Sequence, residues 1–137
     1  MSGDHVPSSL QRRVRERAAS RCEYCGIAQE SQEATFHIDH VVPRRSGGET
    51  VLDNLALACV SCSLRKGAKE SALDPVTGEV SPLYHPRRAQ WSDHFELTED
   101  GAIVGRTPTG RATAHALQMN RPLALALRRA LRANGQS

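Results

Sequence analysis

FHIDHVVP, residues 36–43, is the stretch of sequence from which the expected fold and chemistry of this protein follow. Its Phe, Ile and Val residues are typical of a β-strand and predict a strand over residues 35–42. A strand has no need of two imidazoles and a carboxylate within four residues, yet His37, Asp39 and His40 stand there. We infer that these polar side chains are present for chemistry.

Alternate side chains of a strand share a face, so His37 and Asp39 are expected to point one way and His40 the other. A twist at the strand end, before Pro43, lets Asp39 and His40 reach one site. An aspartate oxygen suits Mg²⁺, and a neutral imidazole accepts a proton from water. Phosphodiester hydrolysis needs that pair of groups. Taken singly, each residue has a blander explanation, as a surface histidine or a capping aspartate.

Four cysteines form two matched pairs, Cys22-x-x-Cys25 and Cys59-x-x-Cys62. This spacing lets both thiolates of a pair reach one Zn²⁺ ion, and a closed four-cysteine site is structural because it leaves no coordination position for chemistry. This four-cysteine site, the cysteine clamp, would hold both ends of the segment that contains the HIDH strand. Four ordinary small core residues are a weaker alternative, because the cysteines form two matched pairs in a short chain. A thioredoxin-like redox site is weaker still, since no βαβ pattern surrounds either pair.

A cytoplasmic location is the expectation from the N-terminus, which has no basic region followed by an apolar run. The longest apolar run, residues 55–60, is too short to span a bilayer, so no membrane partner is expected. Cysteines remain reduced in the cytosol, which favours metal binding over disulfides.

The remaining sequence predicts an α+β fold. We expect helices at 7–21, 60–69, 111–119 and from 122 onward, a second strand at 55–59, a hairpin of 94–97 with 102–104, and an extended connector over 71–91. The 122 helix is expected to bury Leu123, Leu127 and Leu131 and to turn Arg128, Arg129 and Arg132 outward.

The net charge of +3 is mild, but the arginines gather at the two ends of the chain. Residues 1–21 hold five Arg and two acids, and residues 111–137 hold five Arg and no acid. Basic ends are consistent with a polyanionic partner, and equally with helices that are simply soluble.

As an ordered set, several motifs resemble the HNH endonuclease family in its zinc-clamped branch. They are the two cysteine pairs, HIDHVVPR at 37–44, Gly47-Gly48, Asp53-Asn54-Leu55 and SLRKG at 63–67. The resemblance implies a ββα-metal finger, in which two strands and a helix surround one catalytic Mg²⁺ or Mn²⁺ ion. It implies a nuclease domain at 8–70, while residues 71–137 are expected to form an extension packed on the same domain.

The resemblance also implies roles for single residues. His40 matches the general base, Asp39 the carboxylate that ligates the catalytic metal, and Asn54 the residue that orders the loop and orients the base. Arg65 and Lys66 match a basic helix face that meets phosphates.

Three further positions complete the expected nucleic-acid contacts. His37 is expected to support the metal site without ligating the metal, or to contact a phosphate. Arg44 and Arg45, just past the strand, are expected to contact phosphates.

Ser63 departs from the pattern, because the family usually has Asn or His there to complete the metal site. A serine hydroxyl is a shorter oxygen donor, and it is expected to bind the metal through a water. The alternative is a metal site that is weakened or inactive. The leading hypothesis is therefore an endonuclease that cuts DNA. The alternatives are a zinc-stabilised nucleic-acid-binding module without catalysis and a protein-interaction domain. The oligomeric state is left open.

Overall fold

The computed structural model describes residues 5–135. In chain order the main elements are α1 (Ser8–Arg17), β1 (His37–His40), β2 (Leu55–Ala58), α2 (Val60–Lys66), β3 (Ser71–Leu73), β4 (Val80–Pro82), α3 (Trp91–His94), β5 (Phe95–Leu97), β6 (Ile103–Gly105), α4 (Pro108–Ala116) and α5 (Pro122–Ala133). Short 3₁₀ turns lie at Gln29–Ser31, Arg44–Ser46 and Leu52–Asn54. The described chain is an α+β fold with small antiparallel sheets, as predicted.

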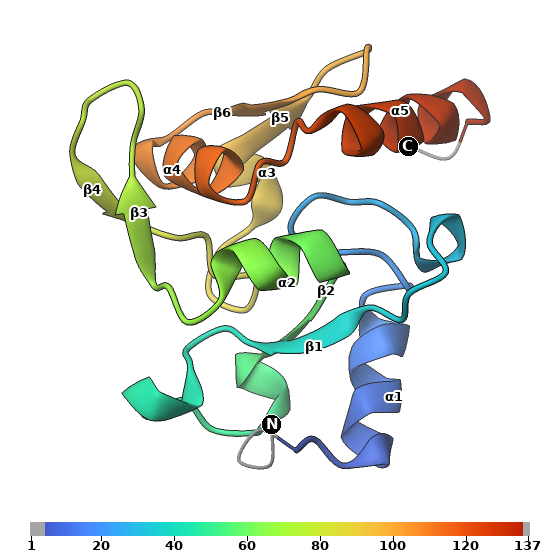
Figure 1. The fold of residues 1–137 in the computed structure, drawn as a ribbon, viewed down its shortest axis with the longest axis vertical. Coiled ribbons are helices and arrows are strands. Elements are labelled where there is room, and N and C mark those ends of the chain that lie inside the picture. The colour runs from blue at the N-terminus through green and yellow to red at the C-terminus, as the bar shows by residue number, and fades with distance from the viewer. Residues whose placement is uncertain (1–4, 136–137) are drawn as a thin grey trace.

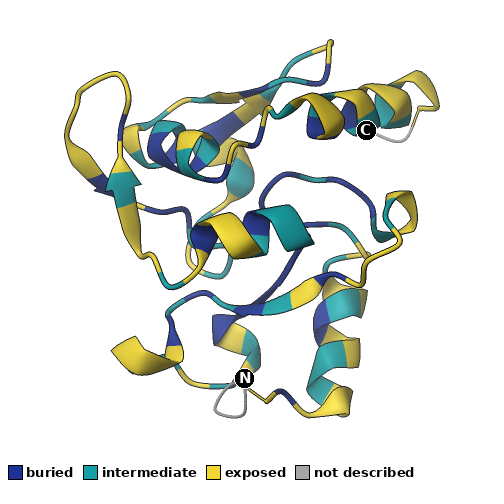
Figure 2. Cartoon of the chain, viewed as in Figure 1, coloured by how far each residue is buried: buried dark blue, intermediate teal, exposed yellow. Residues whose placement is uncertain are grey.

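The unit that positions the site is a ββα arrangement of β1, β2 and α2. β1 and β2 pair antiparallel, with His37 opposite Ala58 and His40 opposite Leu55. β2 is buried along its whole length (Figure 2), because α1 and α2 both contact it and so cover the hairpin. Figure 1 shows α2 lying across this hairpin.

The helix of this unit, α2, and the helix α1 that packs on β2 are both shorter than predicted. α1 ends at Arg17 because Ala19 and Ser20 adopt left-handed backbone angles, with φ of 54° and 56°. α2 begins where the Cys59 Sγ accepts a hydrogen bond from the Cys62 amide, and it ends before Gly67, whose φ is 53°.

The extension beyond α2 contains two hairpins, of which one was predicted. β5 and β6 pair antiparallel as expected. The connector predicted over 71–91 is wrong in part, because β3 and β4 form a further hairpin within it. α4 begins at Pro108 rather than at 111, since Thr107 caps it by accepting a hydrogen bond from the Gly110 amide.

The extension contacts the first half of the chain through polar groups as well as through the shared core. The Trp91 indole donates a 3.0 Å hydrogen bond to the Tyr24 carbonyl, and Arg87 forms an ion pair with Glu23. Phe95, Leu117 and Ala124 belong to the same buried cluster as the residues of β2. These contacts fix the extension over the Cys22–Cys25 turn.

The last helix packs differently from the prediction. Arg128 is 3% exposed, and its guanidinium donates to the carbonyls of Gly101 and Cys25 and to the side chain of Asn120. Leu123 is instead exposed. The helix therefore turns Ala124 and Arg128 inward, where the guanidinium donates to the carbonyls of Gly101 and Cys25.

Within residues 5–135, no helix is both long enough and apolar enough to cross a membrane.

Candidate active site and zinc centre

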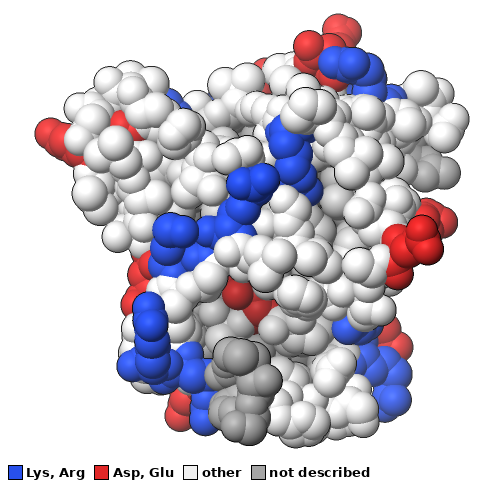
Figure 3. Space-filling view, in the orientation of Figure 1, with Lys and Arg blue, Asp and Glu red and all other residues white. Residues whose placement is uncertain are grey.

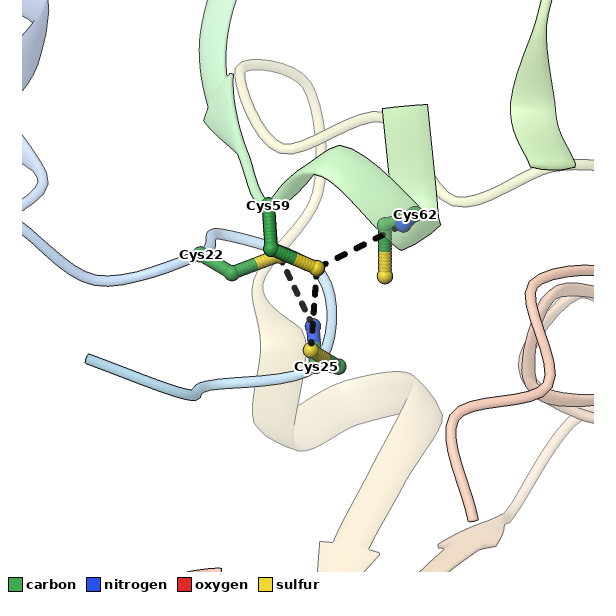
Figure 4. Close-up of side chains that lie close together, drawn as sticks. All are labelled: Cys22, Cys25, Cys59 and Cys62. Carbon is green, nitrogen blue, oxygen red and sulfur yellow. Dashed lines mark hydrogen bonds between the residues drawn. The ribbon is translucent and has the colours of Figure 1, made fainter. Parts of the chain in front are cut away.

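The four cysteines converge at the junction of the Cys22–Cys25 turn with the start of α2 (Figure 4). All four are buried, and their Sγ atoms lie within 4.8 Å of one another, with Cys25 and Cys59 at 3.7 Å. A tetrahedral zinc–tetrathiolate has Zn–S bonds of about 2.3 Å and hence S···S separations of about 3.8 Å. The residues therefore fit a structural Zn²⁺ ion.

Arg121, which precedes α5, reaches this centre from the extension. Its Nη2 lies 3.4 Å from the Cys59 Sγ and 3.8 Å from the Cys25 Sγ. A zinc ion bound by four thiolates carries a net charge of −2, so a guanidinium at this distance offsets part of it. This contact could not be predicted from the sequence, because Arg121 lies 62 residues beyond Cys59.

An open cleft of about 750 Å³ runs along β1, between α1 and the end of α2. His37, Asp39 and His40 of β1 line it together with Ser63 of α2, and Gln11 and Arg15 of α1 line its other side. The structure thus brings the three polar residues of the HIDH stretch to one cleft, even though alternate strand positions face opposite ways.

Asp39 is buried at the floor of the cleft, with 8% of its surface exposed. Its Oδ2 accepts a 2.8 Å hydrogen bond from the Tyr24 hydroxyl and lies 3.3 Å from the Lys66 Nζ. Burial raises the pKa of Asp39 above its ordinary value, and the charge of Lys66 opposes that shift. Burial also raises the pKa of Tyr24, so its hydroxyl remains a donor.

The position of Lys66 differs from the prediction. It was predicted on a basic helix face in contact with phosphates, but it is 1% exposed. Its Nζ donates to the Val41 carbonyl at 3.0 Å and pairs with Asp39. The contacts with Val41 and Asp39 show that the Lys66 side chain faces the end of β1 rather than solvent. Lys66 therefore holds the Asp39 carboxylate through a buried ion pair.

His40 is half-buried, and its Nε2 lies 2.9 Å from the hydroxyl of Thr50. Arg44 donates to the same hydroxyl at 3.2 Å. The hydrogen bond to Thr50 holds the imidazole ring in one orientation at the edge of the cleft. Thr50 was not identified from the sequence, where it is an ordinary polar loop residue.

Asn54 orders the loop that follows β1. Its side-chain oxygen accepts from the Val42 amide, and its Nδ2 donates to the carbonyls of Val42 and Glu49, at 2.9–3.0 Å. Gly48 passes so close to this point that a Cβ there would stand 1.8 Å from the Val42 oxygen. Asn54 and Gly48 together fix the loop that carries Thr50.

Ser63 and His37 are in contact across the mouth of the cleft, with 2.8 Å between the Ser63 Oγ and the His37 Nδ1. His37 is exposed. The carboxylate, hydroxyl and imidazole donors on this side of the cleft are of the types that a divalent cation accepts. Asp39, however, supplies the one carboxylate, because no other Asp or Glu lines the cleft in the described chain.

Positive charge gathers on the face that carries α2. Figure 3 shows a band of Lys and Arg side chains that crosses this face and continues toward the Arg44–Ser46 turn. Arg44 and Arg45 of that turn are exposed, as are Arg65 of α2 and Lys69, three residues beyond its end. The predicted phosphate contacts are thus on the surface, with the exception of Lys66.

Comparison with protein families places an HNH endonuclease segment at residues 22–69. That segment begins at the first cysteine and ends just after α2, so it contains both cysteine pairs and the ββα unit. It confirms the resemblance read from the motifs. Neither curated proteins nor solved structures gave a match to the chain. The HNH segment supports a nuclease-type function, or more broadly a function on nucleic acids.

Proposed function

We propose that this protein is a metal-dependent endonuclease that hydrolyses phosphodiester bonds of DNA. The observation that carries the proposal is the cleft, which holds the imidazole of His40 and the carboxylate of Asp39 at the end of one strand. The exposed arginines of the neighbouring Arg44–Ser46 turn provide the positive surface that a phosphate backbone needs.

In the proposed reaction, His40 accepts a proton from a water molecule that attacks the scissile phosphorus. Thr50 keeps the ring of His40 oriented, and Asn54 keeps the loop that carries Thr50 in place. Asp39 would hold Mg²⁺ or Mn²⁺, which supplies charge stabilisation at the scissile phosphate and the leaving oxygen. The family resemblance implies products with 5′-phosphate and 3′-hydroxyl ends.

A second candidate is a zinc-stabilised module that binds nucleic acid without cleaving it. One observation favours it: Asp39 is already paired with Lys66, and Ser63 stands where the family carries Asn or His. Both candidates keep the zinc clamp and the basic face, so both predict salt-dependent DNA binding. Only the first predicts cleavage.

The test is nicking of supercoiled plasmid by zinc-loaded protein, with added Mg²⁺ or Mn²⁺. We compare the natural chain with His40→Ala and with His115→Ala, an exposed histidine of α4 that does not line the cleft. We expect cleavage by the natural chain and by His115→Ala, and loss of cleavage in His40→Ala. Folded protein that binds DNA but cleaves with neither metal would favour the binding module.

A further inference from the structure

The contact between Ser63 and His37 suggests how this chain completes its metal site with a serine at the position where the family carries Asn or His. The Ser63 hydroxyl lies 2.8 Å from the Nδ1 of His37, in the cleft that also contains Asp39. A serine side chain is shorter than the Asn or His that the family carries there, so Ser63 alone projects less far into the cleft. The imidazole of His37 lies directly beside it.

His37 and Asp39 both turn toward α2. His37 contacts Ser63, and Asp39 contacts Lys66, one helical turn further along α2. Residues three apart on a helix lie on the same face, and residues two apart on a strand do so too. The imidazole and the carboxylate are therefore on the same face of β1, and both face α2.

We propose that His37 supplies the metal ligand that the helix lacks: its Nε2 and the Asp39 carboxylate hold the divalent cation together, and Ser63 orients the imidazole instead of binding the cation. This inference deepens the proposed function and rests on it, since it names ligands for the same cation. It changes the expected role of His37 from a phosphate contact to a ligand, and that of Ser63 from a ligand to a positioning residue.

The hydrogen bond has the pattern that metal-binding histidines show. Such histidines hold one ring nitrogen in a hydrogen bond, which fixes the tautomer and presents the other nitrogen to the metal. When Nδ1–H donates to the Ser63 hydroxyl, the lone pair of His37 is on Nε2. His37 is exposed, so the ring is accessible from the open cleft.

Lys66 makes a second ligand necessary. Its ammonium group lies 3.3 Å from the Asp39 carboxylate and neutralises part of the charge that would attract a cation. A carboxylate so paired is a weak ligand by itself. Imidazole nitrogen suits Mn²⁺ better than Mg²⁺, because Mg²⁺ prefers oxygen ligands. The proposal therefore predicts that Mn²⁺ binds more tightly than Mg²⁺ at this site.

The test follows Mn²⁺ bound to zinc-loaded protein by electron paramagnetic resonance, with electron spin-echo modulation to detect a ligated imidazole nitrogen. The matched variants are His37→Gln and His40→Gln, which remove the two imidazoles of β1. We expect the nitrogen modulation in the natural chain and in His40→Gln, and its loss in His37→Gln with a Mn²⁺ affinity roughly tenfold or more lower. Ser63→Ala should keep the modulation and weaken the affinity.

Three results would overturn the inference: no bound Mn²⁺, bound Mn²⁺ without an imidazole nitrogen, or a nitrogen signal that survives in His37→Gln. These results are separate from the test of the proposed function. Plasmid cleavage by the natural chain, together with Mn²⁺ binding that is unchanged in His37→Gln, would reject the inference and support the proposed nuclease function. His37-dependent Mn²⁺ binding without cleavage would keep the inference and reject the nuclease.

Discussion

Replacement of Lys66 by methionine should destabilise the fold severely. Met keeps most of the length of the Lys side chain, so the change largely keeps the packing and removes the ion pair with Asp39 and the hydrogen bond to the Val41 carbonyl. Lys66 is 1% and Asp39 8% exposed, and 3.3 Å separates their charged atoms, so the pair belongs among buried ion pairs. Removal of one partner from such a pair costs about 3–5 kcal/mol.

The loss of unfolding free energy should depend on pH. Burial already raises the pKa of Asp39, and Lys66 opposes that rise. Without Lys66 the pKa of folded Asp39 rises further above its unfolded value of about 4. The folded state then binds the proton more tightly than the unfolded state, so stability falls as the pH rises through this window. The variant should therefore lose more stability at pH 7 than at pH 4.5.

The assay is urea or thermal unfolding of the zinc-loaded protein, followed by circular dichroism at both pH values. At pH 7 we expect a melting temperature lower by roughly 10–15 °C. Lys69→Met is the matched control, because Lys69 is exposed and should change the free energy by no more than about 0.5 kcal/mol. Asp39→Asn combined with Lys66→Met should recover part of the loss. Equal stability of Lys66→Met and Lys69→Met at pH 7 would refute the reasoning.

Removal of zinc by a strong chelator should unfold the chain, as loss of its circular dichroism would report, whereas a fully folded metal-free protein would contradict the structural role of the cysteine clamp. Arg121→Gln should release zinc to a chromophoric chelator roughly tenfold more readily than Arg106→Gln. Arg106 is the matched control because it is an exposed arginine that does not contact the cysteines. Equal release by the two variants would contradict the inference that Arg121 offsets the negative charge of the zinc site. Gly48→Ala should lower the free energy of unfolding by about 1–3 kcal/mol, because its Cβ cannot fit 1.8 Å from the Val42 oxygen, and denaturant unfolding measures this. Gly135→Ala is the comparison, because a Cβ there meets open space and alanine is opposed only by the backbone φ of 73°. The loss in Gly48→Ala should be the larger of the two.

Much of the site was predictable because it is local in sequence. The HIDH strand, the two cysteine pairs and the loop asparagine each have a short pattern whose spacing reflects backbone geometry. The bounds predicted for β1 and α2 from such patterns lie within three residues of the observed ends. The roles of His40, Asp39 and Asn54 remain predictions, although the structure brings the first two to one cleft and uses Asn54 to close the loop.

The misassigned residues share a different property. Lys66 was predicted on an exposed basic helix face by the family resemblance, and Arg128 on the outer side of its helix by periodicity, but both are buried. Each is buried because partners distant in sequence supply its hydrogen bonds: Asp39 and Val41 for Lys66, and Gly101 and Cys25 for Arg128. Periodicity along a helix cannot reveal such partners, since they become neighbours only when the chain folds.

The sequence by itself therefore determined the clamp, the polar strand and the family of the segment at 22–69, because these depend on the types and spacings of nearby residues. Only the tertiary structure decided which charges face inward, which hydroxyl holds His40, and that Ser63 contacts His37 rather than Asp39. The physical reason is that an ion pair or a hydrogen bond depends on distances in space of about 3 Å. The alternation of side chains along a strand and the periodicity of a helix determine only the direction in which each side chain points.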